Sequence, residues 1–170
     1  MKYRLLGDTG IKVSEIGFGC RNFGGKSIIN GVPTTFGDIT EEEGTKILLR
    51  CIELGINTFD TADTYSLGKS ESRLGNFFHD FRSDVLIFTK GGAIPSLSTP
   101  PFEIDFSHNY LISALDRSLK RLQTDYVDVF QAHAPPRSES DFINLEKAFD
   151  IIKSENKAKS VGVSIGKNYN

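Results

Sequence analysis

The sequence predicts an α/β fold in which parallel strands alternate with amphipathic helices after a short N-terminal hairpin. Short apolar, β-favouring runs recur along the chain, and several end in an ionisable residue, as at Asp60 and Lys90. Between these runs the apolar residues return at helical spacing, as at Leu74 and Phe78. No internal repeat, charge block or low-complexity linker divides the chain, so we expect residues 1–170 to form a single domain.

The first segments predict a hairpin followed by a buried strand. Residues 3–6 and 11–14 favour β structure, and the sequence Gly7-Asp8-Thr9-Gly10 between them permits a tight reversal. The run Glu15–Cys20 follows as the first buried strand of the alternating series.

Two helices are expected on either side of the second strand, which spans residues 56–60. Thr40 and Glu43 form a capping-box pattern that begins the first helix, and Gly55 is expected to end it. Ser70 is expected to cap the second helix, because apolar residues recur after it at i, i+3, i+4 and i+7. These apolar residues are Leu74, Phe77, Phe78 and Phe81.

The remaining segments continue the alternation. They are a strand at 85–90, a proline-rich loop, a helix with one apolar face between 111 and 122, a strand at 126–133, a helix at 145–152 and a strand at 159–164. The proline-rich loop is long enough to cover a site at the end of its strand. The whole series predicts about five parallel strands and about four helices.

Composition argues against nucleic acid, membrane and metal partners. With 20 basic and 22 acidic residues, the chain has no positive field that would attract a phosphate backbone. The sequence has no run of about 18 apolar residues, and its N-terminus lacks the apolar stretch of a signal peptide, so we expect a cytoplasmic protein. Neither Cys20 nor Cys51 belongs to a disulfide or zinc pattern, and His79 and His108 lack partners at ligand spacing.

Three ionisable residues share one position in this pattern, the end of a strand. Asp60, Lys90 and His133 each end an apolar strand, and Tyr65 lies in the loop after Asp60. Because the carboxyl ends of parallel strands meet at one edge, we expect the four side chains to converge. A tyrosine can donate a proton to a developing alkoxide, and a lysine ammonium can stabilise the phenolate that remains. A carboxylate can hold that ammonium, and a histidine can bind a carbonyl oxygen.

Each of the four residues also has a plainer interpretation. Taken alone, Asp60 suits an Asx-turn, and Lys90 suits a solvated strand end. His133 could be an ordinary loop histidine and Tyr65 a half-buried aromatic residue. Singly, therefore, these residues are weak indications of an active site, and the sequence around them decides between the two interpretations.

The segments around these residues resemble the aldo-keto reductase family over nearly the whole chain. The segments are Phe59-Asp60-Thr61-Ala62-Asp63-Thr64-Tyr65, then Gly68, Glu71 and Leu74-Gly75, then Phe88-Thr89-Lys90, and Leu119 to His133, which reads Leu-Lys-Arg-Leu-Gln-Thr-Asp-Tyr-Val-Asp-Val-Phe-Gln-Ala-His. The resemblance implies a TIM-type (β/α) barrel that reduces an aldehyde or ketone to an alcohol with NADPH or NADH. It also implies that Tyr65 is the general acid, that Lys90 and Asp60 tune it, and that His133 orients a small carbonyl substrate.

The resemblance also places Asp60 and Ser164 at the cofactor. Val161-Gly162-Val163-Ser164 is similar to the family's fifth strand, where a serine and an asparagine meet the nicotinamide carboxamide, but Ile165 replaces the asparagine here. Gly17-Phe18-Gly19 lacks the third glycine of a Rossmann phosphate loop, so its glycines are attributed to close backbone packing.

Chain length sets a second expectation about the barrel. A closed barrel of this type typically takes about 250 residues, so the sequence is expected to be truncated after the fifth barrel strand and to bind NADPH weakly. Two hypotheses follow. One is an active carbonyl reductase, and the other is a catalytically inactive half-barrel that folds by self-association. Both open edge strands would be apolar, which favours a homo-oligomer.

Overall fold

A single parallel sheet forms the centre of the computed structural model, which describes residues 1–97 and 101–165. The strand order is β11-β10-β7-β6-β3, so each successive βα unit adds its strand beside the previous one. This order is that of a (β/α) barrel wall, and it confirms the predicted parallel fold. The five strands are β3 (Phe18–Gly19), β6 (Thr58–Asp60), β7 (Leu86–Gly91), β10 (Val127–Ala132) and β11 (Ala158–Val163).

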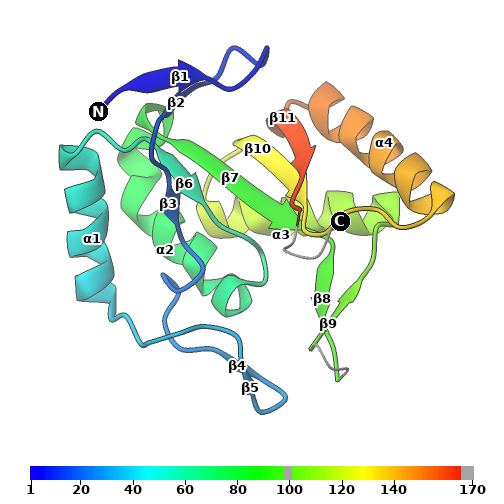
Figure 1. Cartoon of the computed structure of the whole chain (residues 1–170), viewed down its shortest axis with the longest axis horizontal. Coiled ribbons are helices and arrows are strands. Elements are labelled where there is room, and N and C mark those ends of the chain that lie inside the picture. Colours follow the sequence, from blue (N-terminus) through cyan, green and yellow to red (C-terminus); the bar gives the residue numbers. More distant parts are fainter. Residues whose placement is uncertain (98–100, 166–170) are drawn as a thin grey trace.

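Helices pack against the outer face of this sheet, with α1 and α4 at the two sides and α2 and α3 behind the central strands (Figure 1). Their apolar stripes meet the strand side chains that point outward. Phe59 of β6 lies 4.7 Å from Phe78 between ring centres, and Phe130 of β10 lies 6.5 Å from Phe149. The helices are α1 (Glu41–Glu53), α2 (Lys69–Phe78), α3 (His108–Leu122) and α4 (Glu139–Ser154), joined by two short 3-10 segments, η1 (Tyr65–Gly68) and η2 (His79–Asp84).

Alternation along β7 separates the two faces of the sheet. Ile87 and Thr89 point toward the helices and have no exposed surface. Leu86 and Phe88 alternate with them on the inner face and are partly exposed. The core therefore lies between sheet and helices, and the inner face remains open in the described residues.

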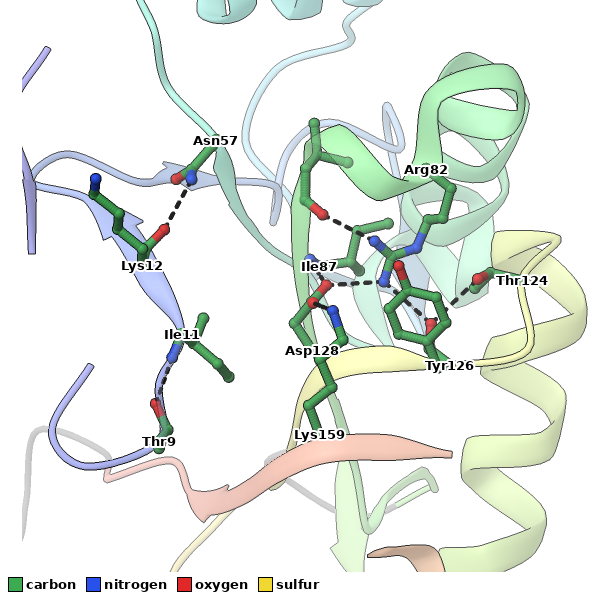
Figure 2. A network of polar contacts seen from close by, with 11 residues as sticks. Thr9, Ile11, Lys12, Asn57, Arg82, Ile87, Thr124, Tyr126, Asp128 and Lys159 are labelled. Carbon is green, nitrogen blue, oxygen red and sulfur yellow. Dashed lines mark hydrogen bonds and ion pairs between the residues drawn. The ribbon is translucent and has the colours of Figure 1, made fainter. Parts of the chain in front are cut away.

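An antiparallel hairpin, β1 (Tyr3–Leu5) with β2 (Lys12–Ser14), lies at the amino end of the sheet, as predicted (Figure 1). Asn57, just before β6, fastens it. Its Oδ1 accepts a hydrogen bond from the Ser14 amide at 2.8 Å. Its Nδ2 donates to the Lys12 carbonyl at 3.0 Å, the bond drawn in Figure 2.

Two further hairpins lie at the opposite, carboxyl end of the sheet (Figure 1). They are β4 (Ile28–Ile29) with β5 (Val32–Pro33), and β8 (Ala93–Pro95) with β9 (Phe102–Ile104). The second occupies the proline-rich loop, where the sequence predicted only a covering segment. Both hairpins extend from the end at which the strands deliver Asp60 and Lys90.

The structure corrects the predicted N-cap of the second helix. Helix α2 begins at Lys69, after Gly68 in the left-handed region at φ 87°. Ser70 is inside the helix and fully buried, where its hydroxyl lies 3.0 Å from the Cys20 carbonyl and 2.9 Å from Thr61 Oγ1. The hydroxyl is used to join α2 to the sheet rather than to cap the helix, a contact that local sequence does not reveal.

Two other predicted boundaries were wrong. The run Glu15–Cys20 contributes only Phe18–Gly19 to the sheet, and Ile16 is 60% exposed. Helix α2 ends at Phe78, so Phe81 lies in η2, although its ring still packs 5.5 Å from that of Phe78. In both segments an aromatic side chain, Phe18 or Phe81, packs against the core, although the strand or helix is shorter than the pattern predicted.

Across residues 1–97 and 101–165, none of the helices is both long and apolar enough to span a bilayer. In the same described part of the chain, no group of three or more His, Cys, Asp or Glu side chains could hold a metal ion. His79 is exposed, and His108 lies beside Asn144 with its Nδ1 3.4 Å from Oδ1.

Candidate active site

The four side chains expected to converge do so at the carboxyl end of the sheet. Asp60 ends β6, Lys90 lies near the end of β7, His133 follows β10 and Tyr65 begins η1. Lys90 forms an ion pair with Asp60, and its Nζ lies 5.2 Å from the centre of the Tyr65 ring. The Tyr65 ring in turn meets His133 edge to face, with ring centres 5.7 Å apart. Strands β6 and β7, the segment η1 and the residue after β10 thus contribute side chains to one cluster.

Lys90 is the buried cation of this cluster, with only 6% of its side chain exposed. Its ammonium donates to Asp60 Oδ1 and, at 2.9 Å, to the Thr61 carbonyl. The Asp60 side chain is 41% exposed, so the ion pair is buried on one side and open on the other. A lysine ammonium has three N–H donors, and two of them are used here. The ammonium also lies over the Tyr65 ring, whose face attracts positive charge.

His133 is held in its neutral form. Burial, followed by the positive charges of Lys90 and Arg21, lowers its pKa from 6.5 to about 4. At neutral pH its ring therefore has one donor nitrogen and one acceptor nitrogen. Its Nδ1 lies 3.5 Å from Thr64 Oγ1, and its backbone amide donates to the Gly91 carbonyl at 2.8 Å.

The loop between Asp60 and Tyr65 follows the adjacent strand β7 rather than leaving it. The Thr61 amide donates to the Phe88 carbonyl at 2.8 Å, and the Asp63 amide donates to the Lys90 carbonyl at 3.1 Å. After Tyr65, three consecutive residues have positive φ, namely Ser66, Leu67 and Gly68. Non-glycine residues in this region are strained, and the buried Ser66 hydroxyl offsets the cost by donating to the Gly25 carbonyl at 2.8 Å.

Asp63 is a buried carboxyl group that the sequence did not single out. Among the described residues its Oδ1 has no hydrogen-bond partner. Burial and, to a smaller extent, the negative charge of Glu71 raise the pKa of this carboxyl to about 7 against the opposing charge of Arg121. Asp63 therefore titrates near neutrality. The sequence around Asp63 does not indicate this, because the charged groups that shift its pKa, Glu71 and Arg121, lie on α2 and α3.

A cavity of about 270 Å³ opens beside Tyr65 and His133. Thr34, Thr64 and Arg21 add polar groups to its wall, while the β8–β9 hairpin adds apolar ones. The apolar lining residues are Ala93, Phe102 and Ile104. A site with an apolar wall and a few directed polar groups is typical of small-molecule binding.

Ser164 is not among the residues that line this cavity. It follows β11 at the same end of the sheet, where its amide donates to the Ala132 carbonyl at 2.8 Å. The neighbouring Ile165 is 74% exposed. Ser164 thus shares the carboxyl edge with the cluster but lies one strand beyond His133.

Arg21 is a cavity residue that sequence reasoning missed. Its Nε donates to the Thr34 carbonyl at 3.3 Å, and its guanidinium lies 5.7 Å from the centre of the Phe36 ring. The signal that could have found it is positional, because Arg21 comes directly after the first barrel strand. Asp60, Lys90 and His133 were found by the same criterion on the other strands.

Comparisons with known proteins agree with this arrangement. The sequence profile described as "Aldo/keto reductase family" matches residues 15–170. An oxidoreductase of Bacillus subtilis, YqkF, is 32% identical over 164 residues, which cover 96% of this chain and 49% of the relative. L-galactose dehydrogenase of Arabidopsis thaliana is 32% identical over 169 residues, covering 96% and 48%.

Among solved structures, the holo form of the aldo-keto reductase AKR11C1 from Bacillus halodurans superimposes with a TM-score of 0.82 at 32% identity. The match covers 97% of this chain and 50% of that one. The chain thus spans about half the length of the relatives it matches, and its sheet and helices form part of a TIM-type barrel. On the profile match and on this structural likeness, the chain belongs to the aldo-keto reductase family.

Proposed function

We propose that this protein acts in the NAD(P)H-dependent reduction of an aldehyde or ketone to an alcohol. The observation that supports the proposal most strongly is the Lys90–Asp60 ion pair beside the Tyr65 ring, which also contacts a neutral His133 edge to face. This cluster joins a proton donor and a hydrogen-bonding group, both lining one cavity, with a cation beside the donor that can stabilise it after proton loss.

Each residue has a distinct part in the proposed reaction. The carbonyl oxygen of the substrate binds between the Tyr65 hydroxyl and a nitrogen of His133. As negative charge develops on that oxygen, Tyr65 donates its proton, and the nearby Lys90 ammonium stabilises the phenolate. Asp60 holds the ammonium in place through their ion pair. His133 contributes a neutral hydrogen bond, because its pKa of about 4 keeps it uncharged at neutral pH.

The inner face of the sheet offers room for a planar ring beside this cluster. A side chain added at Gly19 would meet no atom within 4 Å, and one added at Gly162 would meet only Gln131 at 3.8 Å. Such bare backbone allows a flat group to approach closely. NADPH or NADH would be held there by Asp60 and Ser164, and when bound it supplies the hydride that the carbonyl carbon accepts.

The decisive test is the substitution Tyr65→Phe, which removes only the proton donor. We expect the rate of aldehyde-dependent NADPH oxidation, followed at 340 nm, to fall by at least about 100-fold. Tyr126→Phe is the matched control, because Tyr126 lies at the amino end of the sheet near Arg82 and Lys159. Turnover in Tyr65→Phe equal to that of the control would contradict the proposed role, and a parent protein without turnover would contradict the proposed function.

Affinity for the cofactor is a separate measurement. Because Ile165, which is 74% exposed, replaces a carboxamide that could pair with nicotinamide, we expect NADPH to bind this chain more weakly than it binds a family member with asparagine there. Isothermal titration calorimetry of the parent and of Ile165→Asn measures the difference. Tighter binding by Ile165→Asn supports the assignment, and equal affinity contradicts it.

As a second candidate we propose an inactive half-barrel that folds by self-association into a homo-oligomer. The observation that favours it is the open sheet, since β3 and β11 are each hydrogen-bonded to one neighbouring strand among those described. Unpaired strand edges invite pairing with another chain. Sedimentation equilibrium over a concentration series distinguishes the cases, because a folded monomer at tens of micromolar would contradict self-association.

A further inference from the structure

The cavity beside Tyr65 has one formal charge among its described lining residues, that of Arg21. The other lining side chains are neutral at neutral pH, including His133, whose ring is uncharged. The nearby Lys90 ammonium is matched by Asp60. The wall at which the carbonyl group would react is therefore net positive, and no acidic side chain in this wall offsets it.

Arg21 is an exposed side chain whose guanidinium makes its hydrogen bond to the described residues through Nε alone. Nε donates to the Thr34 carbonyl, and the group lies over the Phe36 ring. Within residues 1–97 and 101–165, no carboxylate lies within ion-pair distance of Arg21, and neither of its terminal nitrogens donates a hydrogen bond. By contrast, the buried Lys90 pairs with Asp60, and the half-buried Arg121 pairs with Glu71.

An arginine fork with free donors is suited to one kind of ligand. Its planar N–H groups match the two oxygens of a carboxylate or a phosphate and bind them in a bidentate manner. Because Arg21 lines the same cavity as Tyr65 and His133, an anion bound there would belong to the molecule whose carbonyl group is reduced. The residues Ala93, Phe102 and Ile104 would contact the apolar part of that molecule.

We propose that Arg21 is a specificity-determining residue, which selects small carbonyl substrates that carry a carboxylate or phosphate group. The inference rests on the proposed reductase function and adds to it a substrate class. The cavity volume of about 270 Å³ limits the substrate to a small molecule. Arg21 binds the anionic group, and this contact fixes the distance between that group and the carbonyl carbon.

Matched pairs of substrates test the proposal through activity. Benzaldehyde is compared with 4-carboxybenzaldehyde, and glyceraldehyde with glyceraldehyde 3-phosphate, so the two pairs distinguish a carboxylate from a phosphate. We expect Arg21→Gln to lower kcat/KM for an anionic member by about 10- to 100-fold, the range for a lost charge-assisted hydrogen bond, and to leave its neutral partner within about twofold. Arg21→Lys should fall between, because it keeps the charge but loses the fork.

Arg50→Gln is the control, since Arg50 lies on α1 and pairs on the surface with Glu53. It should leave all four substrates unchanged. An equal loss for the neutral and anionic members of both pairs in Arg21→Gln would overturn the proposal, because Arg21 would then act on the shape of the site and not on substrate charge.

A second readout needs no turnover and so separates this inference from the proposed function. The titration of His133 is followed by NMR with benzoate or inorganic phosphate as the added anion. In the parent protein the bound anion offsets the charge of Arg21 and raises the pKa of His133 above its value of about 4. In Arg21→Gln the pKa should be raised without anion, and the anion should shift it no further. Equal anion-induced shifts in both proteins would refute an anion site at Arg21, whether or not the protein reduces aldehydes.

Discussion

The two ends of the parallel sheet each place an aspartate beside basic side chains, but they treat the charges differently. At the amino end, Asp128 of β10 is completely buried and accepts hydrogen bonds from Arg82 at 2.9 Å, from Lys159 at 2.8 Å and from the Ile87 amide at 2.9 Å (Figure 2). The Tyr126 ring lies 4.4 Å from the Arg82 guanidinium and 4.5 Å from Lys159 Nζ. Both carboxylate oxygens have partners, and the network ties three strands and η2 together.

At the carboxyl end the polar groups are incompletely matched. Asp60 is 41% exposed beside the buried Lys90, Arg21 has no acidic partner among the described residues, and Asp63 Oδ1 is buried without a hydrogen bond in that same set. His133 is held neutral by burial and by two positive charges. A buried carboxyl oxygen without a partner in the described structure, as at Asp63, is unfavourable for the folded state, whereas the exposed Arg21 is solvated and its donors are available to a ligand.

The difference indicates that the two ends of the strands serve different purposes. Closed networks at the amino end stabilise the fold, because breaking a buried pair leaves an uncompensated charge. Open groups at the carboxyl end are available for chemistry, as in other (β/α) barrels, where the active site lies at that end. The amino end is itself imperfect, since Arg82 Nε is buried without a partner in the described structure.

Substituting one charged residue at each end provides the largest expected contrast. Asp128→Asn removes the charge that pairs with Arg82 and Lys159, and it should lower the free energy of unfolding by about 3 to 5 kcal/mol. Arg21→Gln removes an exposed charge that has no acidic partner among the described residues, and it should change that free energy by less than about 0.5 kcal/mol. Urea unfolding at pH 7 measures both. Equal losses in the two variants would show that the ends do not differ in this way.

The pH dependence of stability sharpens the description of the carboxyl end. Asp63 has a folded-state pKa raised from 3.8 to about 7, so its stabilising contribution is complete below pH 3.8 and is lost as the pH rises through about 7. His133 has a pKa lowered from 6.5 to about 4, so its contribution is present above pH 6.5 and is lost as the pH falls through about 4. The two slopes oppose each other in the parent protein.

Removing either group should therefore expose the slope of the other. In Asp63→Asn, stability should rise between pH 4.5 and 6 by up to about 1.4 kcal/mol per pH unit, and in His133→Gln it should fall with a similar slope. Urea unfolding at several pH values in this interval measures the slopes. The same slope in both variants would contradict the two pKa shifts.

The smallest expected effect tests how much each of the two cations that bind Asp128 contributes to stability. Lys159 is 52% exposed, whereas Arg82 is 11% exposed, although both bind Asp128. Lys159→Gln should therefore lower the free energy of unfolding by no more than about 1 kcal/mol, because water screens an exposed pair. Thermal and urea unfolding should give consistent values. A loss as large as that in Asp128→Asn would mean that Lys159, and not Arg82, is the essential partner.

Local sequence was sufficient wherever a feature depends on neighbouring residues. The capping box at Thr40 is an example, since its Oγ1 accepts from the Glu43 amide at 3.2 Å and the Glu43 carboxylate accepts from the Thr40 amide at 2.9 Å. Strand order and the meeting of Asp60, Lys90 and His133 also followed from sequence, because a parallel sheet brings successive carboxyl ends to one edge.

Tertiary structure alone decided the features that depend on distant segments. Ser70 caps nothing because the Cys20 carbonyl, 50 residues away, accepts its hydrogen bond. The neutral state of His133 comes from burial and from the charges of Lys90 and Arg21, and the raised pKa of Asp63 comes from burial beside Glu71. Burial and charge act through space, with a strength set by distances that a chain pattern does not contain. The sequence by itself therefore determined that Asp60, Tyr65, Lys90 and His133 meet, because parallel strands end at one edge. Only the folded chain brought Arg21 to the cavity and set the protonation states of His133 and Asp63, because these depend on distances between segments far apart in the sequence.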